Sequence, residues 1–313
     1  MSEGIGTKQN AKIVVVGSSN TDMVAMAEHI PAPGETVMGT RFFTAPGGKG
    51  ANQAVAAARL GARVTMVACA GDDSFGRAAV EGFQAEGIDT RHIALDPDAP
   101  SGIALITVDA KGENAITVAP GANARLSPEH VRSAEGAIRD ADALLLQLEI
   151  PLDAVEAAAR IARDAGTLVI LNPAPAPDGG LPPELLAITD VLVPNQTEAA
   201  GLAGQSGLDA EDAVRALLGA GCRRVVVTLG SRGALAADSD ATFAVPSPKV
   251  RAVDTTAAGD AFCGALAVAL AEGQRFEAAV RFAVKAAALS VTVPGAPPSL
   301  PSRRAVEEFT PGG

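Results

Sequence analysis

The sequence predicts an α/β fold: a mostly parallel central sheet with helices on both faces, plus a small β-sheet lid. The first observation is regular alternation, in which short aliphatic, β-branched runs are followed by alanine-rich stretches of helical length. The second is that two strand-rich excursions interrupt this alternation. The third is that the 313 residues contain no repeat and no low-complexity linker, so we expect one principal domain over residues 1–313.

Composition and charge narrow the class of partner. The chain is 48% hydrophobic with a net charge of −11, which argues against nucleic acid or an anionic membrane as the main partner. A bound phosphate would therefore have to be held by local geometry. Residues 1–10 are polar and predict a disordered leader, and three scattered cysteines without metal-ligand spacing favour a reduced, cytoplasmic setting.

The first strand is expected at Lys12–Val16, and Gly17-Ser18-Ser19-Asn20-Thr21-Asp22 follows it. This turn lacks the GxGxxG spacing of a dinucleotide-binding loop. Asn20 and Asp22 come just after the carboxyl end of a strand, where open α/β sheets place their ligands. An amide and a carboxylate suit sugar hydroxyls, although an Asx turn would use the same residue types.

The two excursions predict a second sheet, serving as a lid or a dimer surface, although two decorative hairpins would also explain them. Pro31, Pro33 and Gly34 exclude a helix in the first excursion. Within residues of about 21–46 and 98–119 the expected strands are Thr36–Met38, Arg41–Thr44, Gly102–Val108 and Asn114–Val118.

A glycine-rich loop, Gly47-Gly48-Lys49-Gly50, leads into a helix expected at Ala51–Leu60. Its spacing is not that of a Walker A loop. Glycines permit close backbone approach, so the loop could place amides, Lys49 and Asn52 around a small polyol. A plain glycine-rich helix entry is the alternative.

The remaining elements alternate between strand and helix. Expected strands are Val64–Ala68, Ala143–Leu148, Leu168–Leu171, Val191–Pro194, Arg224–Leu229 and an antiparallel pair, Gly233–Ala237 and Thr242–Val245. Expected helices are Ser74–Ala85, Pro128–Asp140, Leu152–Ala165, Pro183–Ile188, Thr197–Ala203, Ala210–Ala220, Ala257–Ala271, Phe276–Val291 and Arg303–Phe309.

Polar residues recur where these strands end. Glu149, Asn172 and Asn195 each follow an apolar run, and a turn at Thr228–Gly233 follows another. The carboxyl ends of parallel strands share one edge of the sheet, so this series predicts one long cleft. Taken singly, each residue could instead be an ordinary helix cap.

The stretch Asp254–Asp260 precedes the alanine-rich helix. Small residues at a helix start leave backbone N–H groups free to converge on an anion, and the helix dipole adds positive charge. Asp260 would place a carboxylate beside that anion. A cradle with an adjacent base is what phosphoryl transfer to a hydroxyl requires, although Asp254 and Thr255 could be simple caps.

Taken together, these motifs resemble those of the ribokinase-like, PfkB-type carbohydrate kinases, from about Lys12 to about Phe309. The resemblance is carried by Gly17–Asp22, Pro33–Thr36, Gly47–Ala54, Ala70–Asp73, Gln147–Glu149, Asn172–Ala176, Pro194–Glu198, Thr228–Gly233 and Asp254–Asp260. It implies an ATP:sugar phosphotransferase that phosphorylates D-ribose at the 5-hydroxyl to give ribose 5-phosphate.

The resemblance also implies roles for individual residues. Asp260 would be the base, with an anion hole formed by the N–H groups of Ala257, Ala258 and Gly259. The sugar would contact Asn20, Asp22, Gly48, Lys49, Asn52 and Glu149. The nucleotide would contact Asn195, Thr228, Leu229, Gly230, Ser231, Arg232, Gly233, Gly259 and Val284.

Two metal ions are implied as well. Glu198 would organise Mg²⁺ through water. An activating K⁺ would be held by Asp254, Thr256, Ser290, Val293, Gly295 and Ser299. The lid is also the family's dimer contact, and the exposed apolar residues expected there, Val37, Met38 and Phe42, point to a homodimer.

Alternatives remain open at this point. Val284 stands where relatives can carry a polar residue near the adenine, so nucleotide specificity could be looser. The acceptor could be another small sugar or nucleoside, such as deoxyribose, fructose or adenosine. A non-catalytic sugar or nucleotide sensor is disfavoured, because a sensor has no need of Asp260 at an anion hole.

Overall fold

The computed structural model describes residues 10–205 and 207–310, and the predicted leader lies outside these ranges apart from Asn10. A nine-stranded sheet forms the body in the order β13-β12-β11-β10-β9-β8-β1-β4-β5. Neighbouring strands from β11 to β5 pair in parallel, whereas β12 pairs antiparallel with both β11 and β13. This arrangement confirms the predicted fold class and the predicted antiparallel pair. The strands are β1 (Lys12–Val16), β4 (Arg63–Gly71), β5 (Asp89–Asp96), β8 (Ala143–Leu146), β9 (Leu168–Leu171), β10 (Val191–Leu192), β11 (Val225–Thr228), β12 (Ala234–Ala237) and β13 (Thr242–Val245).

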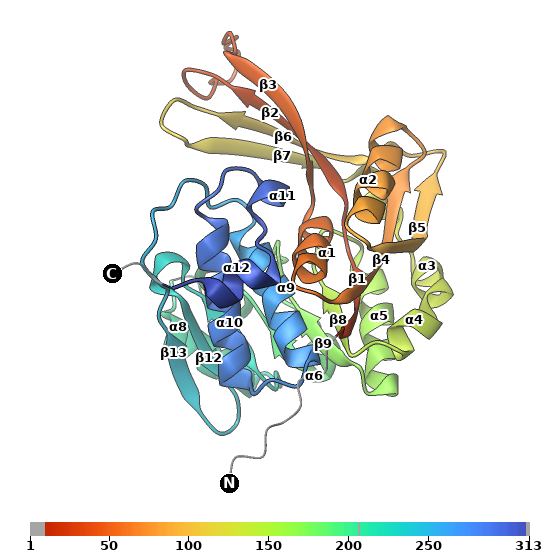
Figure 1. The fold of residues 1–313 in the computed structure, drawn as a ribbon, viewed down its shortest axis with the longest axis vertical. Helices are drawn as coiled ribbons and strands as arrows, with labels where there is room; N and C mark the ends of the chain where they lie inside the picture. Colours follow the sequence, from red (N-terminus) through yellow and green to blue (C-terminus); the bar gives the residue numbers. More distant parts are fainter. Residues whose placement is uncertain (1–9, 206, 311–313) are drawn as a thin grey trace.

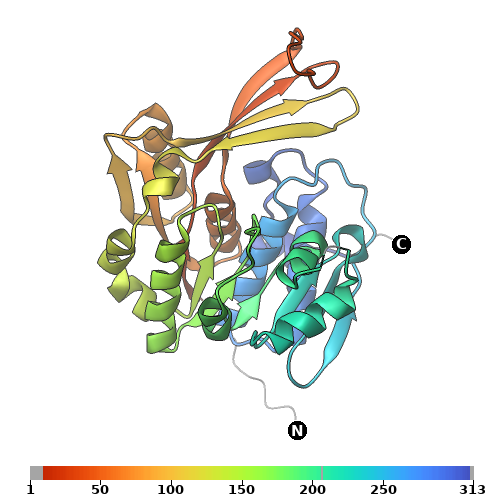
Figure 2. The same ribbon diagram turned by 180° about the vertical axis from the view of Figure 1, so that it is seen from behind.

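Helices cover both faces of this sheet (Figures 1 and 2). On one face lie α1 (Lys49–Arg59), α2 (Ser74–Ala85), α9 (Ala258–Ala271), α10 (Phe276–Ser290) and α12 (Arg303–Glu308), with the short α11 (Ala296–Ser299) nearby. On the other lie η1 (Gly121–Arg125), α3 (Pro128–Ser133), α4 (Glu135–Arg139), α5 (Leu152–Ala165), α6 (Pro183–Ile188), α7 (Gln196–Leu202) and α8 (Ala210–Gly219). A further 3₁₀ turn, η2 (Gly230–Arg232), follows β11.

The central strands explain the apolar runs of the sequence. Every residue of β8 is buried, and alternate residues such as Leu144 and Leu145 belong to the hydrophobic cores on opposite faces. A strand with helices above and below it must be apolar on both sides. This is why the runs are continuous rather than alternating.

Small residues bring α1 and α9 unusually close. A Cβ added at Gly264 of α9 would lie 2.7 Å from the Ala56 Cβ and 3.0 Å from the Gln53 carbonyl oxygen of α1. Any side chain at position 264, even that of Ala, would therefore push the two helices apart. The close approach lets side chains of α1 reach the first turn of α9.

A second, four-stranded sheet projects from the body, as Figure 1 shows. It contains β2 (Asn20–Met26), β3 (Arg41–Gly47), β6 (Gly102–Val108) and β7 (Asn114–Ala119) in the order β3-β2-β6-β7. Neighbours pair antiparallel except β2 and β6, which are parallel. We call it the small sheet.

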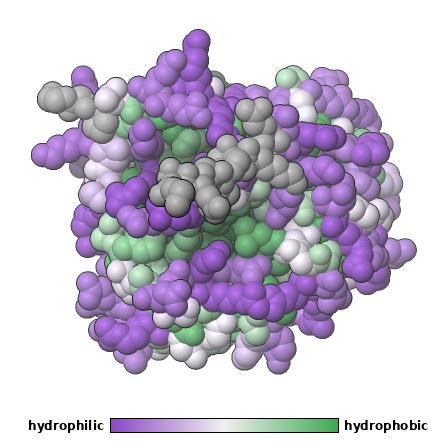
Figure 3. Space-filling model, turned by 60° about the horizontal axis from the view of Figure 1, so that its bottom comes forward, coloured by the Kyte–Doolittle hydropathy of each residue, from purple (hydrophilic) through white to green (hydrophobic). Residues whose placement is uncertain are grey.

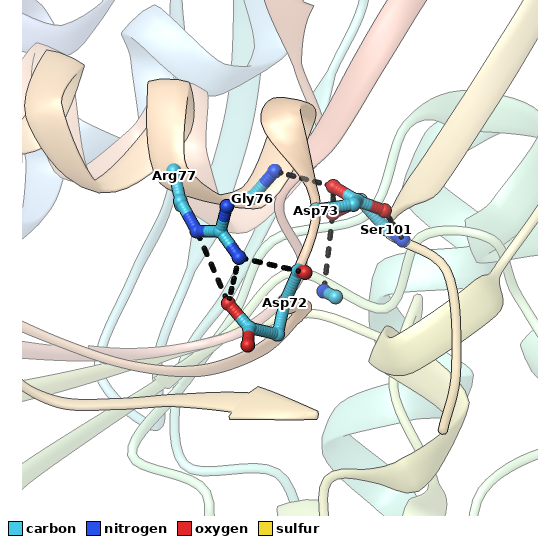
Figure 4. A network of polar contacts seen from close by, with 6 residues as sticks. Asp72, Asp73, Gly76, Arg77 and Ser101 are labelled. Carbon is cyan, nitrogen blue, oxygen red and sulfur yellow. Dashed lines mark hydrogen bonds and ion pairs between the residues drawn. The ribbon is translucent and has the colours of Figure 1, made fainter. Parts of the chain in front are cut away.

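A polar junction ties the small sheet to the body (Figure 4). The Asp73 carboxylate caps α2 by accepting from the Gly76 amide at 2.8 Å, and it accepts from the Ser101 amide at 2.8 Å and the Ser101 hydroxyl at 2.7 Å. Burial opposes ionisation of Asp73, but these hydrogen bonds hold its pKa below the usual range. Ser101 directly precedes β6, so the junction fixes where that strand begins.

Several predicted elements were wrong. Thr36–Met38 forms no strand, whereas β2 begins at Asn20 itself, because Asn20–Met26 pairs on both sides with β3 and β6. The strand β5 was not predicted because its sequence, DTRHIALD, is polar at an exposed sheet edge. The helix expected at 128–140 is interrupted at Ala134, which lies outside helical geometry (φ −99°, ψ 7°).

The base of the molecule, away from the small sheet, presents mainly hydrophilic side chains with hydrophobic ones between them (Figure 3). Near the amino ends of β9 and β11 a cavity of about 570 Å³ is lined by charged groups, among them Asp190, Arg223 and Asp240. Arg223 is paired with Asp190 at 3.0 Å. Among the described residues, no helix has both the length and the apolar character needed to cross a bilayer.

Candidate active site

The order of strands in the main sheet places the predicted polar residues in a row. From β11 through β10, β9 and β8 to β1, the carboxyl ends lead in turn to Thr228, Asn195, Asn172, Glu149 and Asn20. Asn195 forms a parallel bridge with Thr228, and the Asn172 amide donates to the Leu146 carbonyl at 2.9 Å. The predicted cleft residues therefore lie along one edge of the sheet.

Asp260 lies in the first turn of α9 and is buried, with 7% of its surface exposed. Each of its carboxylate oxygens accepts a hydrogen bond from α1: Oδ2 from the Asn52 amide group and Oδ1 from the Gln53 amide group, both at 3.0 Å. Burial raises the pKa of Asp260, while Lys49 and the two amides oppose that rise. The carboxylate is thus largely shielded from solvent, and the two hydrogen bonds hold it in a defined orientation.

The turn before α9 has a constrained backbone. Ala257 adopts a left-handed conformation (φ 59°, ψ 11°), which is uncommon for a residue with a Cβ. The helix consequently begins at Ala258, one residue later than predicted. The Ala258 amide makes only a long hydrogen bond, 3.3 Å, to Thr255, and amides in this first turn lack intrahelical partners.

The glycine-rich loop packs directly against the turn after β1. A Cβ at Gly48 would lie 2.8 Å from the Asn20 backbone nitrogen, and Gly48 has a φ of +92°. A Cβ at Gly50 would lie 2.6 Å from the Ser18 nitrogen. Only glycine fits these two positions, so the contact between loop and turn explains the Gly48-Lys49-Gly50 pattern.

Glu149 links the same two segments. Its Oε2 accepts from the Ser18 hydroxyl at 2.5 Å and from the Lys49 backbone amide at 3.0 Å. On the other side of the turn, Asn123 of η1 accepts from the Ser19 amide at 2.9 Å and donates to Asn20 Oδ1 at 2.7 Å. The side-chain amide group of Asn20 is therefore oriented from the protein side.

A cluster of charges meets where these segments converge. Burial, and then the charges of Glu149 and Asp260, raise the pKa of Asp22 to about 6. Burial disfavours the charged form of Lys49, but the carboxylates of Asp260, Glu149 and Glu198 raise its pKa overall. The cluster combines one cation with several carboxylates, an arrangement suited to a neutral polyol with many hydroxyls.

A cavity of about 520 Å³ opens beside the start of α9. Its lining includes the predicted nucleotide-side residues Thr228, Gly230, Ser231, Gly233 and Val284, together with Ala258 and Gly259 of the predicted anion hole. Apolar groups such as Val250, Phe262 and Ala287 complete one wall. The cavity therefore joins an apolar region to the amino end of a helix.

The predicted Mg²⁺ position lies at the next strand end. Glu198 and Asn195 form a reciprocal cap on α7: the Asn195 amide donates to Glu198 Oε2 at 2.8 Å, and the Glu198 amide to Asn195 Oδ1 at 2.8 Å. Arg232 donates to Gln196 at 2.5 Å, which brings the turn after β11 to the same helix. The described residues contain no group of three or more His, Cys, Asp or Glu side chains that could hold a metal. A single carboxylate fits an ion that is otherwise held by phosphates and water.

The predicted K⁺ ligands fall on two segments joined by Asp254. Its carboxylate accepts from the Thr256 amide and from the Gly295 amide, each at 2.8 Å. Burial would raise the pKa of Asp254, but these hydrogen bonds lower it, so the carboxylate stays charged. The hydroxyls of Ser290 and Ser299 donate to the carbonyls of Ala287 and Ala296, which leaves their lone pairs as acceptors. This oxygen-rich donor set fits a monovalent cation.

Some residues of the site were not predicted. Ser18, Gln53, Asn123 and Gln147 bond to predicted residues or to one another at the cleft. Gln53 and Gln147 stand inside motifs that the sequence analysis singled out, but nothing in the sequence shows that they meet. Asn123 had no signal of its own.

Comparison with known proteins gives a consistent result. The model of the pfkB family of carbohydrate kinases matches residues 10–303. The chain is 45% identical over 300 residues to the ribokinase of Haemophilus influenzae, covering 95% of this chain and 97% of that protein, and 38% identical over 301 residues to the deoxyribokinase of Salmonella typhi, covering 95% and 97%. A structure of Arabidopsis thaliana ribokinase complexed with ribose and ATP superposes with a TM-score of 0.89 at 35% identity, covering 96% of this chain and all of that one. The chain therefore belongs to the pfkB family of carbohydrate kinases.

Proposed function

We propose that this protein is an ATP-dependent kinase that phosphorylates ribose at its 5-hydroxyl. The observation that carries the proposal is the position of Asp260. This buried carboxylate lies between the sugar-side cluster of Asp22, Lys49 and Glu149 and the cavity at the amino end of α9. The ribokinases of the family, 45% identical in one case, support ribose as the acceptor.

Different residues would bind the sugar, accept the proton and stabilise the transferring phosphoryl group. Hydroxyls of the sugar would be bound by Asn20, Asp22, Asn52 and Glu149. Asp260 would accept the proton of the attacking hydroxyl, while the amides at the start of α9 stabilise charge on the transferring phosphoryl group. The small sheet would act as the lid and exclude water, which limits hydrolysis of ATP.

Two ions belong to this proposal. Glu198 would hold Mg²⁺ through water, and Mg²⁺ supplies charge neutralisation for the phosphates. Asp254, with the segment 290–299, would hold K⁺ and thereby order the turn that presents the amides of α9. Support comes from the two hydrogen bonds by which Asp254 links Thr256 to Gly295.

We also propose a cytoplasmic homodimer. The three cysteines are buried free thiols, which suits a reducing compartment. Phe42 and Ile116 are exposed on the small sheet, and Met38 is exposed in the connection between β2 and β3. Val37, predicted to be exposed, is half-buried.

A coupled assay tests the function. ATP turnover is measured with ribose, deoxyribose, fructose and adenosine in the presence of Mg²⁺, with and without K⁺. We expect the highest kcat/KM with ribose and a higher rate with K⁺. ATP consumption that depends on none of these acceptors would exclude the proposal, and faster turnover of deoxyribose would favour the activity named for the Salmonella relative.

The Asp260→Asn variant tests the base. Asn is nearly isosteric but cannot accept the proton, so we expect kcat to fall by about 10²–10⁴-fold with the fold retained. Asp72→Asn is the control, because Asp72 is an exposed carboxylate paired with Arg77. Near-normal turnover by Asp260→Asn would remove this residue from the mechanism.

A further inference from the structure

We propose that Gln53 and Gln147 form a relay of side-chain amides that fixes how Asp260 is hydrogen-bonded, which makes both of them positioning residues for the base. The inference rests on the proposed role of Asp260. Both glutamines are fully buried, with 0% of their surface exposed. Gln53 lies on α1 and Gln147 directly follows β8.

Gln53 uses both hydrogens of its amide nitrogen. Its Nε2 lies 3.0 Å from Asp260 Oδ1 and 3.0 Å from Asn172 Oδ1. Its Oε1 accepts from Gln147 Nε2 at 2.6 Å. The amide group of Gln53 therefore bridges Gln147 on one side to the base and Asn172 on the other.

Two groups that can only accept hydrogen bonds, the Val193 carbonyl and the Asp260 carboxylate, determine the direction of these hydrogen bonds. Asn172 Nδ2 lies 2.8 Å from the Val193 carbonyl oxygen, which can only accept, so Asn172 must present its oxygen to Gln53. An ionised Asp260 also only accepts. Gln53 must consequently present its NH₂ group to both, and its own oxygen must face a donor. Gln147 supplies that donor.

Gln147 holds this orientation at a cost. Its Oε1 has no hydrogen-bond partner among the described residues, although it is buried. It points at Gly17, where an added Cβ would lie 2.1 Å away. Turning the amide over would place its oxygen against the Gln53 oxygen. An unpaired buried acceptor is unfavourable, so its presence indicates that donation to Gln53 is required.

Other groups around Asp260 do not replace the relay. The titratable groups facing it are Lys49 on α1, Glu149 after β8, Asp22 on β2 and Cys263 on α9. Lys49 is shared with Glu149 and Glu198, and Asn52 bonds only the other carboxylate oxygen. Without Gln53, Oδ1 of Asp260 would lose this side-chain donor, which would favour the protonated form of Asp260.

The variants Gln53→Met and Gln147→Met test the relay, because Met keeps an unbranched side chain of similar length but offers no N–H donor. The pKa of Asp260 is followed by the ¹³C shift of its carboxyl carbon, assigned with Asp260→Asn. For Gln53→Met we expect an upward shift of about one to two pH units, the size that loss of a hydrogen bond to a charged group predicts. For Gln147→Met we expect a smaller shift in the same direction. Gln84→Met, on the exposed face of α2, is the control without a shift.

The pH dependence of kcat provides a second, independent measurement. The acid limb of the kcat profile with ribose should move to higher pH with the pKa of Asp260, so that kcat falls on the acid side of the profile and recovers as the pH rises. A merely structural role would lower kcat at every pH. Gln147→Met also removes the unpaired oxygen and should therefore fold, which keeps the test available if Gln53→Met does not.

Each outcome is decisive. An unchanged pKa in both variants overturns the relay, and a shift in Gln53→Met alone overturns the part assigned to Gln147. The ¹³C titration needs no turnover. A wild-type protein that fails to phosphorylate ribose would therefore exclude the proposed function. The titration would still decide whether the two glutamine amides control the pKa of Asp260.

Discussion

At the scale of single residues, the burial of Asp22 opposes stability at neutral pH. Its pKa is raised from 3.8 to about 6, first by burial and then by Glu149 and Asp260. The folded protein therefore binds this proton more tightly than the unfolded chain. The resulting stabilisation is present below about pH 3.8 and is lost as the pH rises through about 6.

Asp22→Asn should therefore stabilise the sugar-free protein at neutral pH, by about 1–2 kcal/mol after allowance for partial exposure. The difference from wild type should grow between about pH 3.8 and 6 and level off at higher pH. Urea unfolding at several pH values measures it, and the KM for ribose should rise in the same variant. A variant less stable than wild type at pH 7 would contradict this account.

Ala257 is the second residue with a specific consequence. Its left-handed backbone conformation costs an L-residue about 1–2 kcal/mol, and a β-branched side chain tolerates it worse. We expect Ala257→Val to lower the free energy of unfolding by at least about 1 kcal/mol and to reduce kcat. Ala257→Gly should change stability by less than about 1 kcal/mol, because relief of strain is offset by greater freedom of the unfolded chain. Equal stability of the Val and Gly variants would contradict the strain.

At the scale of elements, the crossing of α1 and α9 positions Asp260. Gly264→Ala would place a Cβ 2.7 Å from the Ala56 Cβ, so we expect overpacking of about 1–3 kcal/mol. Separation of the helices should also draw Asn52 and Gln53 from Asp260 and lower kcat. The control is Gly82→Ala in α2, where an added Cβ meets nothing within 4 Å and should stabilise by up to about 1 kcal/mol. Similar effects of both substitutions would refute the role of the crossing.

Elements also mark the limit of what the sequence could predict. Helices such as α5 and strands such as β9 were predicted to the residue, because local periodicity determines them. The predicted strand ends lie at one edge because the strands that precede them pair in parallel. The strand β2 and the contact of Gln53 with Gln147 depend on pairing between residues far apart in sequence. No local pattern carries that information.

At the scale of the whole molecule, the small sheet exposes hydrophobic side chains on both of its faces. The pairing register puts Phe42, 65% exposed, on the face of Ala25, while Ile116, 54% exposed, shares the opposite face with Val24 and Asp22. A four-stranded sheet with little of its own body behind it cannot cover these groups. A second copy of the chain would cover these side chains. One of the faces that it covered would be the face that carries Asp22.

We therefore expect the wild-type protein to sediment as a dimer at micromolar concentration. The double variant Phe42→Lys/Ile116→Lys should sediment as a monomer, because it places charge on both faces of the small sheet. Leu95→Lys is the matched control: Leu95 is 40% exposed but lies on β5, outside the small sheet. A monomeric wild type would exclude the dimer. A dimeric double variant would move the interface elsewhere, and loss of ribose turnover in a folded monomer would mean that the lid works only when it is covered by its partner.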